Sequence, residues 1–336
     1  MPQVTIKEIA LKAGLARSTV SEILSGKNNY CSEENRQKVK KIAAEMGYRP
    51  NIGFKIMTNR DSGTYSIIFS QERTYYTESN QTLASQLLRE IESRQGSTYT
   101  AIFDNNADNN MERIRELVSR GSRKFIFLGY PVGIEKIYEF LRREKCCYTS
   151  FNGYSYHGSR LCVMVDYTAV FREYFQYFRK HAMPFKVLSS PSFFAKVATP
   201  LCREFDLDPN NLLVPTRSLE HVAADCSDIY FNMALEKSGE FIRSNRDIHG
   251  WICASDIEAL AVVNKLKEYN LPVEAEFGPL VCGFGNTSAA RYSVQPIVTA
   301  DLQLRKVSTS LLAGLKAADD QIIYYKPDII FGKNSQ

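Results

Sequence analysis

The sequence of 336 residues lacks the marks of a membrane or secreted protein. No uninterrupted apolar run approaches the roughly 18 residues that a membrane-spanning helix needs, and residues 1–10 contain no apolar stretch like that of a secretory signal. Glycine and proline number only 18 and 12, too few for a collagen-like or low-complexity chain. We therefore expect a cytoplasmic protein with no membrane partner.

Metal-binding and disulfide patterns are also missing. The eight cysteines include no Cys-x-x-Cys pair, and only four histidines could complete a metal site. Most of the cysteines fall in apolar, strand-like runs such as residues 160–165, where a cysteine usually serves as a small buried hydrophobic residue. We expect no metal, no disulfide and no cofactor.

Catalytic signatures are absent as well. The chain has no P-loop, no His-Glu-x-x-His and no Gly-x-Ser-x-Gly motif, and residues 283–285 lack the third glycine and the early strand of a dinucleotide site. The acidic pair Asp319 and Asp320 falls in a polar loop, where solvent exposure explains it. The sequence therefore does not favour an enzyme.

Positive charge, by contrast, is concentrated at one end of the chain. The chain is long enough for two or three domains, and its net charge is +5. Residues 1–60 contain eleven Lys and Arg against five Glu, so this segment carries +6 and residues 61–336 carry −1. A basic segment joined to a nearly neutral body suggests that one part meets a polyanion, although a solvated basic face is the commoner explanation.

The basic segment predicts three short helices. A Thr5/Glu8 capping box begins a helix over about residues 6–13, which Gly14 ends, and a second helix follows over about residues 17–25. The apolar contacts between these two helices are expected from Ile9, Ala10, Ala13, Leu15, Val20 and Ile23.

The third helix of this segment begins at the N-cap Ser32 and ends at Gly47. Its outer face carries Arg36, Lys38, Lys40 and Lys41, which could approach phosphates or simply be solvated. A small residue at 10, a turn residue at 14 and an aliphatic residue at 20 have the spacing of a helix-turn-helix.

Five ordered segments resemble the DNA-binding headpiece of the lactose-repressor (LacI/GalR) family of bacterial transcription regulators. They are Thr5–Ala10, Ala13–Leu15, Ser18–Ser21, Ser32–Val39 and Gly47–Asn51. The resemblance implies a homodimer, or a dimer of dimers, that binds a pseudopalindromic operator in double-stranded DNA with the second helix of each headpiece in a major groove.

When the family's contact positions are carried over to this sequence, the headpiece residues fall into two groups, those that read bases and those that contact the DNA backbone. Base reading falls to Arg17, Ser18 and Glu22, and backbone contacts fall to Thr5, Thr19, Ser21, Asn29 and Asn35. Ala16 replaces the usual hydroxyl residue that contacts a phosphate, so that contact is lost or passes to a neighbour. Glu22 replaces an arginine that reads guanine; it could accept from cytosine N4 or pair with Arg17, and the sequence leaves both open.

Residues 50–63 form the predicted join between headpiece and body. In the family this stretch becomes a hinge helix on the operator, and Met57 matches the apolar side chain that enters the minor groove. A flexible tether with an exposed Met57 is the alternative.

Strand-like and helix-like runs alternate from residue 64 onward, which predicts an α/β body with parallel sheets. The strands are expected near residues 65–70, 99–104, 124–130, 161–165, 185–190, 212–214, 249–254 and 280–283. The helices are expected near residues 80–94, 111–120, 134–143, 168–180, 193–205, 227–244 and 256–268. The predicted fold is an all-α helix-turn-helix headpiece at residues 1–49 and a body at 64–336 with two doubly wound parallel sheets.

The resemblance covers the body more weakly and implies a bilobed, periplasmic-binding-protein-like architecture. The first lobe would comprise about residues 64–160 and 293–325, and the second about 161–292 and 326–336. Ligands of such folds bind in the crevice where the strands end.

Six body residues are candidates for binding an effector. Asp256, in the segment 251–260, falls on an acidic effector ligand of the family, although an aspartate there could also cap the following helix. Asn152, Lys196 and Asn286 stand at altered family positions. The pair Tyr75 and Tyr76 could stack on a sugar ring.

The sequence therefore predicts a DNA-binding transcription regulator, a repressor controlled by a small, sugar-like effector. The alternative is a solute-binding or sugar-modifying protein with a vestigial headpiece. The identity of the effector, the operator sequence, the direction of regulation and the choice between dimer and tetramer are not determined by the sequence.

Overall fold

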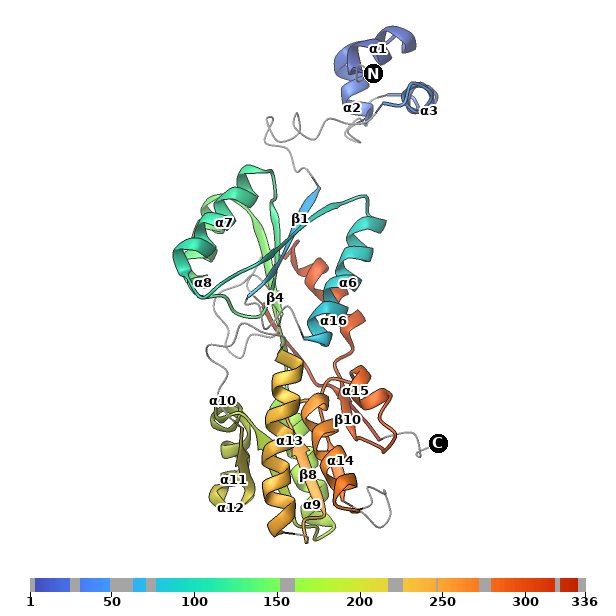
Figure 1. Ribbon diagram of the computed structural model, residues 1–336. Helices are drawn as coiled ribbons and strands as arrows, with labels where there is room; N and C mark the ends of the chain where they lie inside the picture. Colours follow the sequence, from blue (N-terminus) through green and yellow to red (C-terminus); the bar gives the residue numbers. More distant parts are fainter. Residues whose placement is uncertain are drawn as a thin grey trace. The chain divides into compact units, whose positions relative to one another are not determined.

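The computed structural model describes residues 4–24, 31–48, 63–70, 77–151, 161–216, 226–245, 247–271, 279–317 and 321–331. It divides into two units, residues 1–62 and 63–336, and each is described by itself (Figure 1). No described helix combines the length and apolar character needed to cross a bilayer. The predicted site residues Asn29, Met57, Tyr75, Tyr76 and Asn152 lie outside the described residues, as does the join up to residue 62.

The first unit contains α1 (Ile6–Ala13), α2 (Arg17–Leu24) and α3 (Glu33–Glu45). The predicted capping box is confirmed: the Glu8 amide donates to Thr5 Oγ1 at 3.4 Å, and the Thr5 amide donates to Glu8 Oε2 at 2.7 Å. The bonds that the Thr5 amide and hydroxyl donate to the Glu8 carboxylate hold the pKa of this carboxyl below its usual value. Gly14 ends α1 with φ of 71°, a left-handed conformation that glycine adopts without steric cost.

The three helices share one small apolar core. Its buried members are Ile9, Ala10, Ala13, Val20, Ile23, Val39, Ile42 and Ala43, and Leu15 packs against them half-buried. The members from α1 and α2, with Leu15, are the residues predicted to make the contacts between these two helices, so the helix-turn-helix arrangement is confirmed in the described part of the unit.

The first lobe of the body contains a six-stranded parallel sheet in the order β11-β5-β4-β3-β1-β2. Its strands are β1 (Thr64–Phe69), β2 (Ser97–Ile102), β3 (Lys124–Leu128), β4 (Cys147–Phe151), β5 (Leu161–Val165) and β11 (Gln321–Tyr325). Figure 1 shows one pair of helices on each side of this sheet. The pairs are α6 (Glu78–Ser93) with α16 (Leu304–Gly314), and α7 (Ala107–Ser119) with α8 (Ile134–Arg143).

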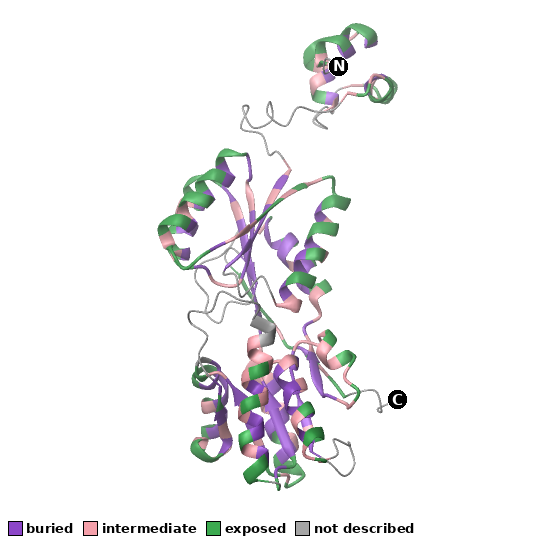
Figure 2. Ribbon diagram, in the orientation of Figure 1, coloured by how far each residue is buried: buried purple, intermediate pink, exposed green. Residues whose placement is uncertain are grey.

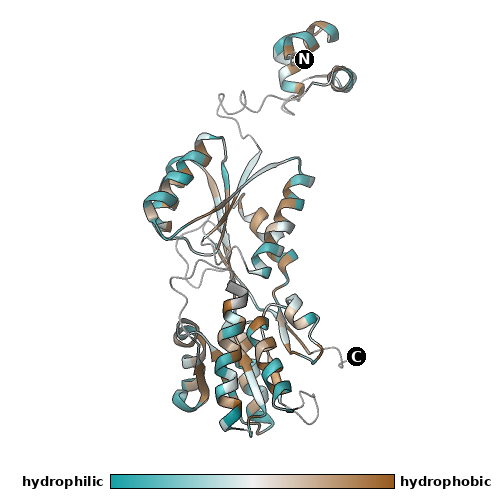
Figure 3. Ribbon diagram, viewed as in Figure 1, coloured by the Kyte–Doolittle hydropathy of each residue, from teal (hydrophilic) through white to brown (hydrophobic). Residues whose placement is uncertain are grey.

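Successive side chains of each strand point to opposite faces of the sheet, and apolar residues on both faces explain why helices cover both. Ile67 and Phe69 belong to the core beneath α6 and α16, whereas Ile68 and Phe127 belong to the core beneath α7 and α8. Figure 2 shows this sheet as mostly buried, and Figure 3 shows hydrophilic residues on the outer sides of α7 and α8. The four central strands β1, β3, β4 and β5 are therefore mostly buried, as in a doubly wound fold, whereas the edge strands β2 and β11 are largely exposed.

The second lobe contains a four-stranded parallel sheet in the order β7-β6-β8-β9. Its strands are β6 (Phe185–Ser189), β7 (Leu213–Pro215), β8 (Gly250–Cys253) and β9 (Leu280–Cys282). The helical segments are α9 (Tyr167–Lys180), α10 (Pro191–Phe193), the π-helix η1 (Phe194–Ala198), α11 (Thr199–Glu204), α12 (Pro209–Leu212), α13 (Cys226–Ser244), α14 (Asp256–Glu268) and α15 (Ser288–Arg291). Ile252 of β8 packs in the core with α9, and Trp251 packs in the core with α13 and α14.

Strand pairing corrects two predicted lobe boundaries. β5 was expected to open the second lobe, but it pairs with β4 and β11 and so completes the first sheet. The return to the first lobe was expected near residue 293, but β10 (Thr299–Asp301) pairs antiparallel with β12 (Asp328–Ile330), and Val298 bridges Cys282 of the second lobe. The chain therefore enters the first lobe again only at α16, because long-range hydrogen bonds rather than sequence order decide which strands associate.

Candidate DNA-contacting surface and ligand pocket

The exposed face of α2 carries the predicted base-reading side chains. Arg17, Ser18 and Glu22 are exposed, whereas Val20 and Ile23 on the same helix are buried against α1 and α3. Because the apolar side of α2 is held in the core, the polar side must face away from the unit. The helix thus presents Arg17, Ser18 and Glu22 on its exposed side.

The residues predicted to contact the DNA backbone differ in their solvent exposure. Thr19 and Ser21 are half-buried, and so is Asn35 near the start of α3. Thr5 is exposed, but its hydroxyl donates to Glu8 Oε2 at 2.9 Å. A phosphate contact by Thr5 would therefore have to compete with the cap of α1.

Asp256 lies in the body at the first residue of α14 and is completely buried. Its Oδ2 accepts from the Thr287 amide at 2.7 Å and from Thr287 Oγ1 at 3.0 Å, and its Oδ1 accepts from Thr299 Oγ1 at 2.6 Å. Burial raises the pKa of this carboxyl, and the same hydrogen bonds oppose that rise. The N-cap of α14 is Ser255 rather than Asp256, so the carboxylate's observed role is to join α14 to the segment around Thr287 and to β10.

Of two other residues predicted to bind an effector, Asn286 lines the pocket described below and Lys196 does not. Lys196 is exposed on η1 and is not among the residues that line the pocket described below. Asn286 does line that pocket; its amide donates to Thr299 Oγ1 at 3.0 Å and its Nδ2 donates to Asp301 Oδ2 at 3.3 Å. Of the described predicted residues, only Asn286 therefore reaches the pocket wall.

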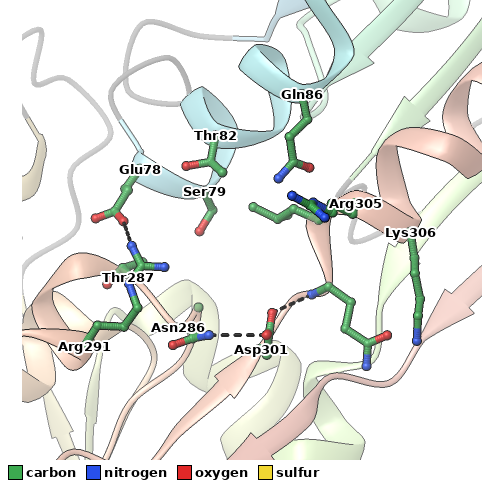
Figure 4. Close-up of a pocket in the computed structure, with 13 residues that line it drawn as sticks. Glu78, Ser79, Thr82, Gln86, Asn286, Thr287, Arg291, Asp301, Arg305 and Lys306 are labelled. Atoms are coloured by element: carbon green, nitrogen blue, oxygen red, sulfur yellow. Dashed lines mark hydrogen bonds and ion pairs between the residues drawn. The ribbon is translucent and has the colours of Figure 1, made fainter. Parts of the chain in front are cut away.

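The pocket has a volume of about 320 Å³ and lies between elements of the two lobes (Figure 4). Helix α6 of the first lobe contributes Glu78, Ser79, Thr82 and Gln86. The second lobe contributes Gly285, Asn286, Thr287, Arg291 and Asp301. Gln303 and the first residues of α16, Leu304, Arg305 and Lys306, complete the lining. This volume is at the lower end of the range for small-molecule sites, about 300–1,000 Å³.

A group of hydrogen bonds that we call the Glu78 clasp joins the lobes beside this pocket. The clasp consists of Glu78, Ser288 and Arg291. The Ser288 amide donates to both oxygens of Glu78 at 2.9 and 3.0 Å, and Ser288 Oγ donates to Oε2 at 2.5 Å. Arg291 Nη2 lies 3.2 Å from Oε1 of the same carboxylate. One side chain of the first lobe thus receives four donor contacts from α15 of the second.

Three consecutive residues of the second lobe each donate to a different carboxylate. Asn286 donates to Asp301, Thr287 donates to Asp256, and Ser288 donates to Glu78. The segment 286–288 therefore connects α14, β10 and α6. Any ligand that displaces this segment would change the contact between the lobes.

Most residues of this pocket were not predicted from the sequence. Glu78 was placed before a helix expected from residue 80, whereas α6 begins at Glu78 itself. The segment 301–306 follows β10, which was not predicted as a strand. In residues 301–306 polar side chains alternate with Leu302 and Leu304 after the apolar pair Ile297 and Val298, which is a local signal that could have marked this segment. No local signal pairs Glu78 with Ser288, which are 210 positions apart.

Comparison with known proteins matches the N-terminal unit to a family and the body to a fold. Residues 5–51 match the family described as "Bacterial regulatory proteins, lacI family". The N-terminal unit is thus a lacI-family helix-turn-helix domain, and the α/β body with its two parallel sheets has the fold of lacI-family regulators. The predicted resemblance and fold class are confirmed.

Individual relatives resemble different shares of the chain. The HTH-type transcriptional regulator AscG of Escherichia coli (strain K12) is 36% identical over 64 residues, so the match spans 19% of this chain and 19% of that relative. The crystal structure of the lac repressor dimer bound to operator and the anti-inducer ONPF superimposes with a TM-score of 0.75 at 14% identity, covering 98% of each chain. A lacI-family regulator from Enterococcus faecium with bound ribose has a TM-score of 0.62 at 13% identity, covering 80% of this chain and 97% of that chain.

Proposed function

We propose that the protein is a sequence-specific DNA-binding transcription regulator, a repressor whose operator affinity is controlled by a small molecule bound between the lobes. The observation that carries the proposal is the α2 surface, where Arg17, Ser18 and Glu22 are exposed on a helix whose other side is fixed in the core. The match of residues 5–51 to the lacI family supports the same use of this helix.

Charge supports a polyanionic partner for the N-terminal unit. The net charge of +6 over residues 1–60 favours association with DNA phosphates, which supply most of the non-specific affinity of such proteins. In this proposal Arg17 and Ser18 read base edges, and Thr19, Ser21 and Asn35 contact the backbone. Asn29 and Met57 keep their proposed roles at the backbone and in the minor groove.

We propose that the binding form is a homodimer or a dimer of dimers, with one headpiece on each half-site. Leu88 on α6 is 37% exposed, and Tyr292 and Val294 after α15 are 77% and 95% exposed. Large apolar side chains that are this accessible on neighbouring segments favour a protein contact. A two-fold dimer would match a pseudopalindromic operator.

Control by a small molecule follows from the position of the pocket. Residues of both lobes line it, so a ligand that binds there contacts both and favours one arrangement of the lobes over another. The neighbour that holds ribose suggests a sugar-like ligand. Lys196, and Tyr75, Tyr76 and Asn152 beyond the described residues, remain candidates for further ligand contacts.

The test is selection of DNA from a random library by the full chain, followed by salt-titrated binding to the recovered sequence. We expect a two-fold related consensus, with affinity that falls steeply as salt rises. Recovery of no consensus would contradict the proposal and favour a solute-binding body with a vestigial headpiece.

A further inference from the structure

Positive charge in the body is concentrated at one edge of the first lobe, where α7 leads into β3 and α8 leads into β4. The six basic residues of these two turns, which we call the basic edge, are Arg120, Arg123, Lys124, Arg142, Arg143 and Lys145. Residues 120–124 and 142–146 contain one acidic residue, Glu144, so the two turns carry +5. Because residues 61–336 together carry −1, the rest of the body carries −6.

The sheet brings the two turns side by side. β3 and β4 are parallel neighbours, and their first residues, Lys124 and Cys147, are paired in register. The Cys147 amide also donates to the Arg123 carbonyl at 2.8 Å, which extends the pairing into the turn before β3. The ends of α7 and α8 therefore belong to one surface rather than to two separate loops.

The charges of the basic edge remain accessible to solvent. Four of its side chains are exposed, and two, Arg123 and Lys124, are half-buried. Arg123 has a structural role, because its Nη1 donates to the Val118 carbonyl at 2.8 Å at the end of α7. Arg143 lies 3.9 Å from Glu144, but solvent screens this exposed pair and the edge keeps its net positive charge.

The basic edge lies where the chain enters the body. Tyr65 of β1, the first strand of the body, is paired with Lys124, and Lys124 Nζ is 4.7 Å from the centroid of the Tyr65 ring. Residues 49–62 join Gly63 to the N-terminal unit, and a chain of this length reaches at most about 50 Å, at about 3.3–3.6 Å per residue. A DNA duplex carries one negative charge per about 1.7 Å of its axis, so DNA held by the N-terminal unit brings many phosphates within that reach.

We propose that the basic edge is a second DNA-contacting surface, which binds backbone phosphates of the duplex that the N-terminal unit reads. Arginine and lysine release counterions from phosphates without reading bases, so this surface adds affinity but no sequence preference. The tether to the N-terminal unit supplies the high local concentration of DNA that a small patch needs. With −6 on the rest of the body, the edge is not expected to hold DNA by itself. The inference rests on the proposed function and extends DNA contact from the headpiece to the body.

The first test compares salt-titrated operator binding by the natural full chain and by a variant of the basic edge. The variant neutralises three exposed residues through Arg120→Gln, Arg143→Gln and Lys145→Gln. The slope of log affinity against log salt should become shallower by about 1 to 3 for each chain bound, since each lost phosphate contact removes about 0.9. The preference for operator over random DNA should not change, because phosphate contacts carry no sequence information.

A matched control removes the same charge from the second lobe. Lys180→Gln, Arg203→Gln and Lys267→Gln neutralise exposed residues in the last turns of α9, α11 and α14. This control should keep the natural slope, which separates a local contact from an effect of net charge. A third variant, with Arg120→Lys, Arg143→Lys and Lys145→Arg, keeps the charge of the edge and should also keep the natural slope.

The second test locates the contact on the surface. Lysine acetylation of the full chain, with and without operator, is read by mass spectrometry. We expect operator to protect Lys124 and Lys145 of the basic edge, and to leave Lys180 and Lys267 as reactive as they are in the free chain.

Three results would overturn the inference. They are an edge variant with the natural salt slope, a second-lobe control whose slope falls as far as that of the edge variant, and a Lys145 that operator does not protect. The first would leave the basic edge to solvent or to an acidic protein. The natural chain tests the proposed function on the same samples: if it binds no operator, the regulator proposal fails, whereas operator binding with any of the three results refutes the second surface alone.

Discussion

Glu22 is the residue on which the sequence preference of the N-terminal unit is expected to depend. It is exposed on α2, where the lactose-repressor family usually has an arginine. A carboxylate accepts hydrogen bonds and cannot donate to guanine O6 and N7, so direct readout by Glu22 would favour cytosine N4 as a donor.

The first prediction is that Glu22→Arg changes the operator consensus at the base pair that this residue faces. The preference should shift toward guanine by about 1 to 3 kcal/mol, because arginine can form two bonds to that base. Parallel selections with both proteins measure the shift. If the two consensus sequences are the same, Glu22 has another role, such as fixing a neighbouring side chain.

Asp256 was singled out from the sequence by its local pattern, but its contacts in the structure are set by distant segments. The local pattern of strand, Ser255 and Asp256 indicated the start of a helix and an acid at the end of a strand. Its burial and its bonds to Thr287 and Thr299 depend on segments more than 30 positions away, which no local pattern specifies.

The second prediction concerns the cost of losing that carboxylate. Asp256→Ala leaves the donors of Thr287 and Thr299 without their partner in a buried site, so the free energy of unfolding of the body should fall by about 2 to 4 kcal/mol. Urea unfolding measures this, with Asp247→Ala, at an exposed residue of the second lobe, as the control. A change below 1 kcal/mol, together with lost ligand affinity, would restore the effector-contacting role that the sequence suggested.

Glu258 is a second buried carboxyl on α14, and burial raises its pKa to about 7 against the opposing effect of its bonds to Ser255. Below about pH 4.5 this group is protonated in both the folded and unfolded chain. Between that pH and about 7 the unfolded chain loses the proton more readily, so the free energy of unfolding falls as pH rises.

The third prediction is that Glu258→Gln removes this pH dependence. The natural chain should lose up to about 3 kcal/mol of stability relative to the variant between about pH 4.5 and 7, and no more above that range. Asp256 adds a change in the same direction in both proteins, because burial raises its pKa too. If the free energies of unfolding of the two proteins change in parallel with pH over this range, the pKa of Glu258 is not raised by folding.

At the scale of elements, the parts that were predicted correctly are those that depend on neighbours in sequence. The capping box of α1, the left-handed Gly14 and the N-cap of α3 involve residues within a few positions of one another. The membership of β5 in the first sheet depends instead on its pairing with β11, about 160 positions away. The Glu78 clasp is of the same long-range kind.

The fourth prediction tests the clasp as the connection between α6 and α15. Glu78→Gln removes the charge that Ser288 and Arg291 face, and should lower the stability of the body by about 1 kcal/mol, since these side chains are partly exposed and screened by solvent. It should also raise the radius of gyration measured by X-ray scattering. Glu92→Gln, on the same helix and exposed, is the control and should change neither quantity.

If the clasp holds the lobes together, its loss should also change the affinity for ligands of the pocket. A Glu78→Gln chain with the scattering curve and ligand affinity of the natural chain would show that the contact between α6 and α15 is only a surface ion pair. Most exposed ion pairs contribute little to stability, so the scattering and affinity of Glu78→Gln decide whether the clasp holds the lobes together.

At the scale of the whole molecule, the two units differ in charge, in the size of their cores and in the sites they carry. The N-terminal unit has its own small core and most of the positive charge, and the body has its own larger cores and the pocket. The core of the body is continuous across the lobe boundary, because one cluster of buried residues includes both Ile67 of β1 and Ile252 of β8. Rearrangement of the lobes is therefore expected to be a limited rotation around this packed region.

The central claim is that the N-terminal unit reads a specific DNA sequence, and one measurement tests it most directly. The full chain, the Arg17→Ala variant and the body alone, residues 63–336, are titrated with the selected operator and with random DNA at several salt concentrations. We predict tight, salt-dependent binding of the operator by the full chain and a loss of about 1 to 3 kcal/mol in operator preference for Arg17→Ala. The body alone should not bind either DNA. Operator binding by the body, or equal affinity of the full chain for operator and random DNA, would contradict the account.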